Sequence, residues 1–329
     1  MRFRLFDHVN EDAERIFSLT EKVRGYSRFF RDRWPWEVLG HPEVGKIQVF
    51  VAETGDGELA GMTIRMPCDL RVGDDKFRAF FATNSQVAPV FRGQGIIQQL
   101  YRLAAEDGAL HLSKGTAAAM YRVLMKMGYR EIVKNRHQKA LLAPWPWVCA
   151  RITGRPARPG WSIAKTEDTT EFKQIYLFGA EHAALEIPSA ITPLLTMDRL
   201  NWRYFLVPHC KYIVYERRRQ GRLLSWFVLR MRGPEAVLVD LRWASEADDD
   251  PGSTLYFAKG LVRRLGAVTM NAWFSHYALR RSLARQYFLV RPETPHFAYF
   301  SNDLSWHDLS WKYAYFVYGD NDTDYLEQD

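Results

Sequence analysis

Cysteines and long apolar runs are scarce in this sequence. Three cysteines occur in 329 residues, and neither their number nor their spacing fits a disulfide framework or a metal site. No stretch of about 18 apolar residues is present, so we expect no membrane span. The first residues turn polar without the apolar core of a signal peptide. These absences predict a cytoplasmic protein that needs no metal.

Apolar and aromatic residues, by contrast, are plentiful. They make up 47% and 14% of the chain, which is enough to fill the cores of two domains of ordinary size. The net charge is +7, and 22 basic minus 17 acidic residues give +5 to residues 1–150 alone. That excess suits a polyanionic cofactor or an acidic carrier protein, although ordinary surface charge is the commoner explanation. The basic residues form no single stripe, which argues against nucleic-acid binding.

The chain contains two copies of one pattern. Trp36 and Pro42 are separated by five residues, and so are Trp202 and Pro208, which lie 166 positions later. After each pair come a lysine, an alternating apolar run, a glycine-centred turn and a second apolar run. This order predicts a β-hairpin in each copy.

The agreement extends upstream of the hairpins and divides the chain. Residues 3–17 and 161–176 each have the pattern of a strand followed by a helix with an N-cap residue, and the second helix is predicted over residues 168–176. The copies predict an N-terminal domain over residues 1–143 and a C-terminal domain over residues 161–329. A linker rich in proline and arginine, residues 144–160, joins them.

Residues 86–97 are the most informative segment, with the sequence Gln-Val-Ala-Pro-Val-Phe-Arg-Gly-Gln-Gly-Ile-Ile. A predicted strand over residues 77–87 leads into it, and a predicted helix begins at Ile96. Glycines allow backbone N–H groups to approach a phosphate closely, and a helix N-terminus adds partial positive charge. This layout predicts a cradle for an anion.

The cradle resembles the acyl-CoA pyrophosphate loop of the GNAT N-acetyltransferase superfamily, whose pattern is Val-x-Pro-x-x-Arg-Gly-x-Gly-Ile. A predicted helix over residues 117–127 that ends at Gly128 and Tyr129 resembles the second signature of that family. The resemblance implies an α/β (α+β) fold of two tandem GNAT-like domains, each with a mixed, largely antiparallel twisted sheet flanked by helices. Two strands of such a sheet splay apart, and the pantetheine arm lies between them.

The resemblance also implies which residues bind the donor, acetyl-CoA or another acyl-CoA. The backbone of Gln86 and Val87 would pair with the pantetheine arm as a strand would. The pyrophosphate would be held by Arg92, Gly93, Gln94, Gly95, Ile96 and Ile97. The family normally has glycine or alanine at the last of these positions, so the side chain there narrows the cradle while its backbone N–H remains available.

The catalytic residues match the family less well. The family often places a tyrosine, which protonates the leaving thiolate, four residues before the glycine that ends the second helix, and this chain has Leu124 there. Tyr121 lies one turn earlier on the same face and is the candidate acid, with Tyr129 a weaker candidate and a half-buried aromatic the alternative. His111, in the next strand, is the candidate base because of its intrinsic pKa, and a packed histidine is its alternative.

The second copy lacks the cradle. Its corresponding strand, residues 236–243, is followed by four carboxylates between Glu246 and Asp250 and then by Pro251. These charges would repel a pyrophosphate, so we expect only the first copy to bind acyl-CoA. The second copy would supply part of the acceptor pocket, where Asp240 could bind an amine or form a buried ion pair.

The sequence therefore predicts an acyl-CoA-dependent N-acyltransferase. A primary amine of a small molecule or an amino sugar would attack the thioester directly, and backbone donors near Val87 would polarise the carbonyl oxygen. One alternative is the same fold with acyl carrier protein or aminoacyl-tRNA as the donor. Another is a non-catalytic acyl-CoA-binding or sensor protein. The sequence specifies neither the acceptor nor the oligomeric state.

Overall fold

Two compact units that alternate along the chain form the structure, which is a computed structural model. The first contains Met1–Ile132 and His296–Leu309, and the second contains Val133–Pro295 and Ser310–Asp329. The structure describes residues 1–26, 28–132, 137–144, 152–153, 169–185, 187, 191–208, 210–244, 251–291, 296–307, 309, 311 and 314–320. Most of the predicted linker and the strand predicted at the start of the second domain lie outside these ranges.

The first unit is built around a seven-stranded sheet. All neighbouring strands in it are antiparallel except β6 and β7, which are parallel. The strands, in sheet order, are β1 (Arg2–Phe6), β2 (Gln48–Glu53), β3 (Leu59–Pro67), β6 (Ala79–Val87), β7 (Leu110–Thr116), β17 (His296–Phe300) and β8 (Arg130–Glu131). The other elements are α1 (Glu14–Arg24), α2 (Arg28–Trp34), η1 (Pro35–Leu39), η2 (Val44–Lys46), the hairpin β4 (Leu70–Val72) and β5 (Asp75–Phe77), η3 (Pro89–Phe91), α3 (Ile96–Ala104), α4 (Ala118–Lys126) and η4 (Leu304–His307).

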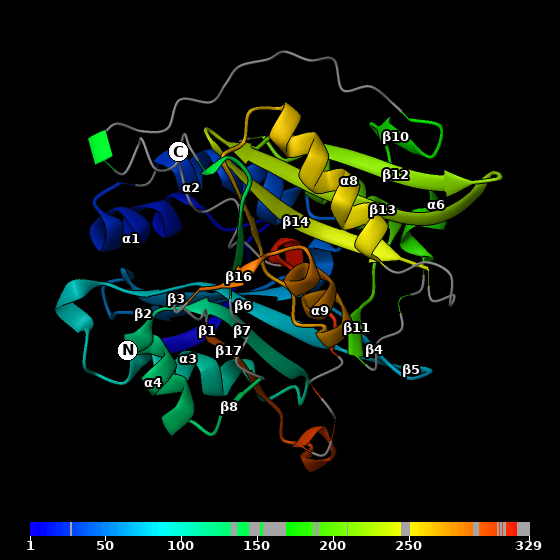
Figure 1. The fold of residues 1–329 in the computed structure, drawn as a ribbon. Coiled ribbons are helices and arrows are strands. Elements are labelled where there is room, and N and C mark those ends of the chain that lie inside the picture. Colours follow the sequence, from blue (N-terminus) through cyan, green and yellow to red (C-terminus); the bar gives the residue numbers. More distant parts are fainter. Residues whose placement is uncertain are drawn as a thin grey trace. The chain divides into compact units, whose positions relative to one another are not determined.

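The second unit repeats this plan with a sheet of its own (Figure 1). Its neighbouring strands are antiparallel except β14 and β15, which are parallel. The strands, in sheet order, are β10 (Phe172–Ile175), β12 (Tyr212–Arg219), β13 (Arg222–Arg232), β14 (Glu235–Trp243), β15 (Thr269–Ala272), β9 (Gln138–Leu141) and β16 (Leu289–Val290). The other elements are α6 (Ala180–Ala183), β11 (Ile191–Pro193), α7 (Met197–Tyr204), α8 (Pro251–Arg264), α9 (Tyr277–Arg285) and η6 (Tyr318–Asp320).

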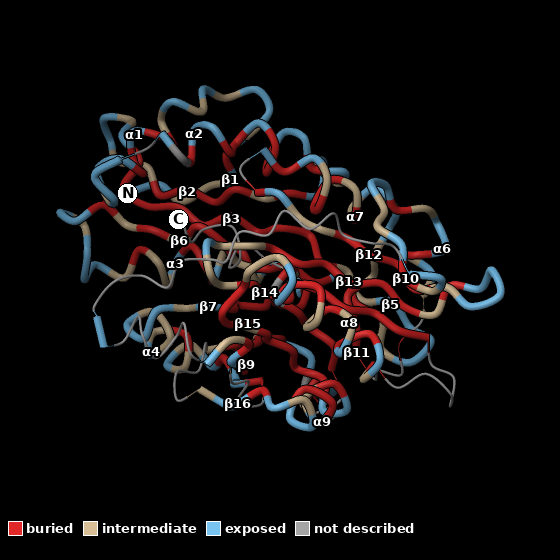
Figure 2. Tube along the Cα trace, turned by 45° about the horizontal axis from the view of Figure 1, so that its top comes forward, coloured by how far each residue is buried: buried red, intermediate tan, exposed pale blue. Residues whose placement is uncertain are grey.

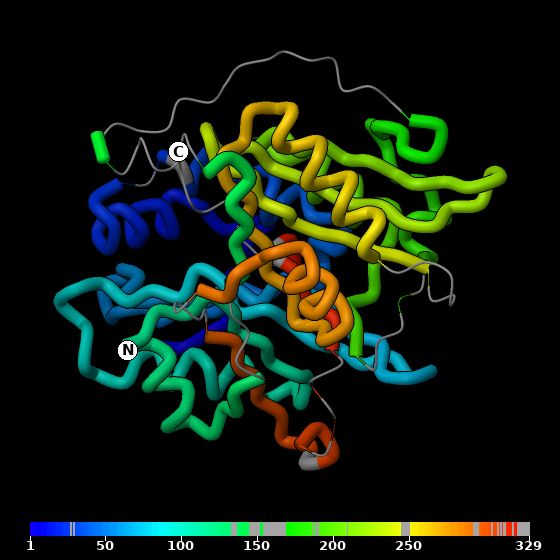
Figure 3. The backbone as a smooth tube through the Cα atoms, in the orientation of Figure 1, coloured from blue at the N-terminus to red at the C-terminus, as the bar shows by residue number. Residues whose placement is uncertain are grey.

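The matching strand order and polarity of the two sheets confirm the internal repeat, and they show that the copies exchange a strand. The sixth strand of the first sheet is β17, from near the C-terminus, and the sixth strand of the second sheet is β9, from the N-terminal half. Figure 3 shows the exchange by colour, with β9 in green beside orange segments and β17 in orange-red beside cyan and green ones. Each copy thus completes the sheet of the other.

The exchange separates the compact units from the contiguous domains that the sequence predicts. The predicted boundaries at residues 143 and 161 assign β9 to the first domain and β17 to the second. In the structure each of these strands belongs to the sheet of the other unit. The repeat alone cannot reveal such an exchange, because a short strand of either copy fits the same place in both sheets.

Most predicted elements are present, including both hairpins, the strand before the cradle and the two helices after it. The helix predicted over residues 168–176 is wrong, because Phe172–Ile175 form the strand β10, antiparallel to β12. Phe172 is buried there, and its ring stacks on Phe257 at 3.9 Å between ring centroids. Tertiary burial of this aromatic side chain overrides the local N-cap pattern.

The central strands carry the core of each unit. All nine residues of β3 are buried, and so are all residues of β14 except the first, which Figure 2 shows as continuous red. In the first unit α1 and α3 both contact β3. A strand buried along its whole length needs such covering on both faces, so the sheet is a middle layer. None of the helices in the described ranges is both long and apolar enough to cross a membrane.

The contact between β3 and α3 generates a stability prediction. A Cβ atom on Gly61 would lie 2.9 Å from Ile96 Cγ2 and 3.2 Å from the Gln86 carbonyl oxygen. Gly61→Ala should therefore lower the free energy of unfolding by about 1–3 kcal/mol in urea denaturation, because β3 and the start of α3 must separate. Gly55→Ala is the matched control, since no atom lies within 4 Å of its added Cβ. Equal losses in the two variants would contradict this close packing.

Candidate functional site

The parallel strands β6 and β7 separate soon after they begin. They pair only through Ala79–Phe81 and Leu110–Leu112, although β6 runs on to Val87 and β7 to Thr116. Every residue from 79 to 116 is described, so the remaining edges do face each other without pairing. Backbone N–H and C=O groups on unpaired edges require other partners. The first unit thus contains the splayed seam that the resemblance implies.

A β-bulge shapes the open part of β6. The pairing with β3 slips by one residue between Met62 and Ile64, and Asn84 has φ +49°. Arg33 Nη2 donates to Asn84 Oδ1 at 3.3 Å, and Arg33 Nε is 2.6 Å from Glu37 Oε2. Both members of this ion pair are fully buried. The buried Arg33–Glu37 ion pair therefore stabilises the bulge through the hydrogen bond to Asn84. Bulges are frequent beside functional sites.

The cradle follows at the end of β6. Gly93 and Gly95 have φ values of +82° and +73°, a region that favours glycine, and α3 begins directly after them. The N–H groups in the first turn of α3 have no partner inside the helix. Arg92 adds a full positive charge beside them, and its Nε donates to the Val87 carbonyl oxygen at 3.3 Å. The sequence folds this way because α3 buries an apolar face, Ile96, Leu100, Tyr101 and Ala104, against the sheet.

A cavity of about 440 Å³ lies between the end of β6, the cradle and α4. Among the described residues that line it, Arg92 is the only one with a charged side chain. The lining consists of Ser85, Gln86, Val87, Phe91, Arg92, Gly93, Gly95, Ile96, Ile97, Gln98, Ala119, Met120 and Val123. The combination of backbone donors, one guanidinium and apolar walls suits a ligand with a polyanionic end and an apolar end.

The structure brings together seven of the eight residues predicted to bind the donor. All line this cavity except Gln94, which is exposed and whose Nε2 lies 3.5 Å from the Val90 carbonyl oxygen. The Gln86 side chain points away, and its Nε2 donates to Thr20 Oγ1 at 2.7 Å, so only its backbone could serve a ligand. Their role as donor ligands stays a prediction.

Tyr121 lies next to the cavity but does not line it. Its ring stacks on His296 at 3.7 Å between centroids. Burial, together with the neighbouring Glu131 to which its hydroxyl bonds, raises the pKa of the phenol. Leu124, at the usual tyrosine position, is fully buried among Tyr101, Tyr129 and Ala298. The predicted acid therefore has a packing role in this structure, and its catalytic role stays a prediction.

His111 and Tyr129 lie inside the core. His111 is 1% exposed, its Nε2 lies 3.1 Å from the Ala104 carbonyl oxygen, and its Nδ1 lies 3.3 Å from Tyr129 Oη. Burial, reinforced by the nearby Arg65, lowers the pKa of His111 to about 3. A ring in this position lacks both the access and the basicity of a general base, so its geometry does not favour the predicted role.

Ser85 was not among the sequence candidates, although it lines the cavity. Its Oγ lies 2.8 Å from Thr63 Oγ1 and 2.9 Å from Tyr101 Oη. A serine inside an apolar strand carries no motif, and the contact depends on the bulge. The sequence gives no signal of a bulge at Asn84 beyond the tolerance of asparagine for positive φ.

The corresponding seam of the second unit is partly closed by the chain itself. The strands β14 and β15 pair only from Glu235 to Leu238, as β6 and β7 do at their start. Beyond that point the backbone of residues 314–317 pairs with residues 274–275, which follow β15, whereas the segment bonds β14 through a side chain. The Ser275 N–H donates to the Phe316 carbonyl oxygen at 3.0 Å, and the Tyr315 hydroxyl donates to the Leu241 carbonyl oxygen. Part of this seam is therefore occupied by the chain itself.

Asp240 belongs to this seam. It is 2% exposed, accepts a hydrogen bond from Tyr204 Oη at 2.9 Å and lies 3.3 Å from Tyr315 Oη, and Arg242 lies nearby. Burial raises the pKa of its carboxyl to about 6. Asp240 therefore lies in a buried network with two tyrosine hydroxyls, and the predicted ion pair stays a prediction. The acidic residues Glu246–Asp250 lie outside the described residues.

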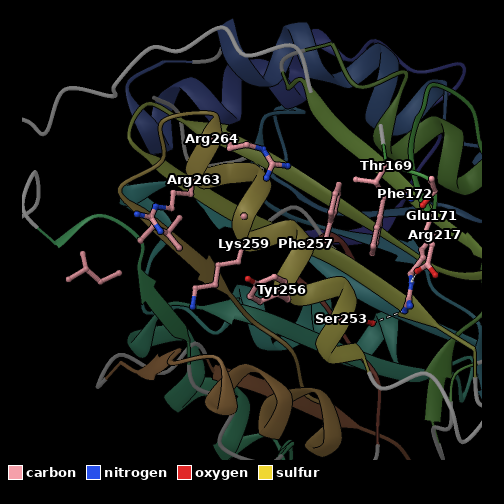
Figure 4. A pocket seen from close by; sticks show the side chains of 14 residues that line it. Thr169, Glu171, Phe172, Arg217, Ser253, Tyr256, Phe257, Lys259, Arg263 and Arg264 are labelled. Atoms are coloured by element: carbon pink, nitrogen blue, oxygen red, sulfur yellow. Dashed lines mark hydrogen bonds and ion pairs between the residues drawn. The ribbon is translucent and has the colours of Figure 1, made fainter. Parts of the chain in front are cut away.

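A larger cavity of about 830 Å³ in the second unit has different chemistry (Figure 4). The stacked rings of Phe172 and Phe257 line it, and Arg217 is paired there with Glu171 at 2.9 Å. Lys259 Nζ donates to the Gln286 carbonyl oxygen at 2.6 Å. Gly260 is the one glycine among the described lining residues, and it lies inside α8, where backbone N–H groups are used by the helix. The described lining therefore contains cations, including Arg263 and Arg264, but no glycine cradle.

The described residues contain one cluster with the composition of a metal site, Glu181, His182 and Glu216. The Gly179 N–H donates to His182 Nδ1 at 2.9 Å, so that nitrogen is an acceptor. The other nitrogen, Nε2, then carries the proton and donates to Glu216 Oε2 at 3.0 Å. Arg218 pairs with both glutamates. The cluster is an ion-pair network in which both ring nitrogens are engaged.

Solved structures with the same fold are known. A probable N-acyltransferase from Enterococcus faecalis is 12% identical, with a TM-score of 0.64, over 91% of this chain and 72% of that chain. N-myristoyltransferase of Saccharomyces cerevisiae, solved with bound myristoyl-CoA, is 12% identical, with a TM-score of 0.58, over 91% and 78%. A GCN5-related N-acetyltransferase from Anabaena variabilis is 11% identical, with a TM-score of 0.61, over 92% and 74%.

These likenesses confirm the predicted fold, two tandem GNAT-like domains with mixed sheets flanked by helices. At such low identity they show the fold alone. No protein-family model matches the chain. No curated protein matches its sequence.

The burial of His111 predicts an acid-sensitive fold. Its pKa of about 3 in the folded unit lies below the ordinary value of 6.5, so the unfolded chain binds the extra proton between these values and stability falls as the pH falls through this window. Between pH 7 and pH 5 this histidine should cost about 2 kcal/mol of unfolding free energy. In urea denaturation at the two pH values, the unfolding free energy of His111→Gln should therefore fall by about 2 kcal/mol less than that of the unsubstituted protein. An unchanged slope would contradict the burial of a neutral ring.

Proposed function

We propose that this chain is an acyl-CoA-dependent N-acyltransferase whose donor site is the cavity of the first unit. The observation that carries the proposal is the open seam between β6 and β7, which ends at a glycine cradle and a helix N-terminus. A similar fold is solved with bound myristoyl-CoA, and another is described as a probable N-acyltransferase.

Different parts of the site suit different parts of the acyl-CoA donor. The pyrophosphate would lie on the N–H groups of the cradle beside Arg92, and the absence of carboxylates from the described lining leaves its charge unopposed. The pantetheine amides would pair with β6 at Gln86 and Val87, along the edge that β7 leaves unpaired, and would replace Arg92 Nε as the donor to the Val87 carbonyl oxygen. The thioester would then lie further back along β6, toward the bulge.

The transfer needs no covalent intermediate on the protein. The amine nitrogen would attack the thioester carbonyl carbon, and a backbone N–H on the open edge of β6 would stabilise the negative charge on the oxygen. The described lining of the cavity contains no histidine or carboxylate, so the amine must arrive neutral or lose its proton to water. A primary amine of a small molecule or an amino sugar is the proposed acceptor.

A non-catalytic acyl-CoA-binding protein is the second candidate. The observation that favours it is the position of Tyr121, packed on His296 rather than in the cavity, together with the buried Leu124. Binding without turnover for a broad panel of amines would support this candidate over the transferase.

Binding of coenzyme A tests the shared basis of both candidates. Coenzyme A at about 100 times its Kd should raise the free energy of unfolding by about 2.7 kcal/mol, measured by thermal or urea denaturation. Arg92→Glu reverses a charge beside the cradle and should weaken binding at least about tenfold, which removes about 1.4 kcal/mol of this stabilisation.

Arg102→Glu is the matched control, because Arg102 is an exposed residue at the other end of α3. It should keep the full stabilisation by coenzyme A. Lack of any stabilisation of the unsubstituted protein at millimolar coenzyme A would rule out the proposed donor site, and equal losses in the two variants would show that Arg92 has no specific role. Comparing acetyl-CoA with myristoyl-CoA in the same assay would indicate the acyl length that the cavity accepts.

A further inference from the structure

Three hydroxyl groups meet where β6 reaches the cavity. Ser85 Oγ has Thr63 Oγ1 and Tyr101 Oη as hydrogen-bond neighbours, and Thr63 also bonds the Tyr101 hydroxyl. Thr63 and Tyr101 are 1% and 3% exposed, whereas Ser85 is half-buried and lines the cavity. One member of a buried hydroxyl cluster therefore faces the space proposed for the donor.

The bulge at Asn84 puts Ser85 into this cluster. Side chains of a regular strand alternate between faces, so Ala82 and Ser85, three residues apart, would point in opposite directions. Ala82 packs against the core around Tyr101, yet Ser85 contacts Tyr101 as well. The extra residue reverses the alternation and turns Ser85 onto the face of α3.

One arrangement of the three hydroxyl protons leaves the Ser85 proton for the cavity. A hydroxyl donates one hydrogen bond and can accept two. When Thr63 and Tyr101 both donate to Ser85 Oγ rather than to each other, the Ser85 proton points to the third side. Burial raises the pKa of Tyr101, so its phenol stays protonated as a donor. The charged group nearest to this arrangement in the described cavity lining is Arg92, a cation.

We propose that Ser85 is the hydrogen-bond and proton donor to the sulfur of the departing coenzyme A, and that Thr63 and Tyr101 are positioning residues. This inference rests on the proposed function. It places the acid on β6, since Leu124 on α4 cannot supply one and Tyr121 does not line the cavity.

The proposed step balances. The amine nitrogen forms a bond to the carbonyl carbon while the carbon–sulfur bond breaks and its electron pair moves to sulfur. The Ser85 proton passes to sulfur, and the proton lost by the amine nitrogen returns to Ser85 through a water molecule. The two neighbouring hydroxyls stabilise the transient negative charge on Ser85 Oγ. The products are the amide and the free thiol of coenzyme A.

The thiol pKa of bound coenzyme A tests the inference without a known acceptor. The thiolate is followed by its ultraviolet absorbance in a pH titration, with the desulfo analogue as the reference that removes the signal of the protein. A donor to the thiolate should lower the bound thiol pKa by about one to two units relative to free coenzyme A. Ser85→Ala should abolish this shift, and Tyr101→Phe should reduce it, while the Kd for protonated coenzyme A stays within about twofold.

Ser113→Ala is the matched control, because Ser113 lies on the neighbouring β7 and bonds Thr116 rather than lining the cavity. It should keep the full shift, and Ser85→Thr, which retains the hydroxyl, should keep most of it. If Ser85→Ala and the unsubstituted protein give the same thiol pKa, the inference is overturned. The proposed function is then unaffected, provided that the protein still binds coenzyme A. Failure of the unsubstituted protein to bind coenzyme A would overturn both.

Discussion

Beyond Phe81 and Leu112 the facing edges of β6 and β7 no longer pair, so their backbone N–H and C=O groups need other hydrogen-bond partners. The rest of the structure depends on which groups supply these partners. The second unit has the same seam between β14 and β15, and there Phe316 bonds Ser275 while the Tyr315 hydroxyl bonds the Leu241 carbonyl oxygen. One fold thus has two outcomes, an edge left open beside a cradle and a seam partly occupied by protein. The open edge is the one suited to a ligand.

The β-bulge at Asn84 lies in the part of β6 that borders the open seam. The bulge at Asn84 is kept in place by the buried pair Arg33 and Glu37, and it turns Ser85 toward Tyr101. A buried ion pair contributes little net stability, so its value here is geometric. Leu124 is buried on α4 where the resemblance leads us to expect a tyrosine, whereas the Ser85 hydroxyl on β6 does line the cavity.

Much of the fold could be predicted from the sequence, because hairpins, glycine turns and amphipathic helices leave local patterns. The Trp–Pro repeat predicted two copies, and the residues from Gln86 to Ile97 predicted the cradle. The exchange of β9 and β17 left no such pattern, since either strand fits both sheets. The strand at Phe172, the burial of His111 and the contact of Ser85 all depend on distant residues. Local sequence patterns predicted the cradle, whereas the positions of the candidate catalytic side chains depend on tertiary packing.

Hydrogen–deuterium exchange with and without coenzyme A tests the central claim most directly. The account predicts protection of amides over residues 85–98, at the open seam and the start of α3, with no change over residues 236–243 in the corresponding seam of the second unit. The amides of Ser275 and Phe316 in the second seam should exchange slowly without ligand, because each already has a hydrogen-bond partner in the protein. Protection confined to residues 236–243, or no protection in either seam at saturating coenzyme A, would contradict the account.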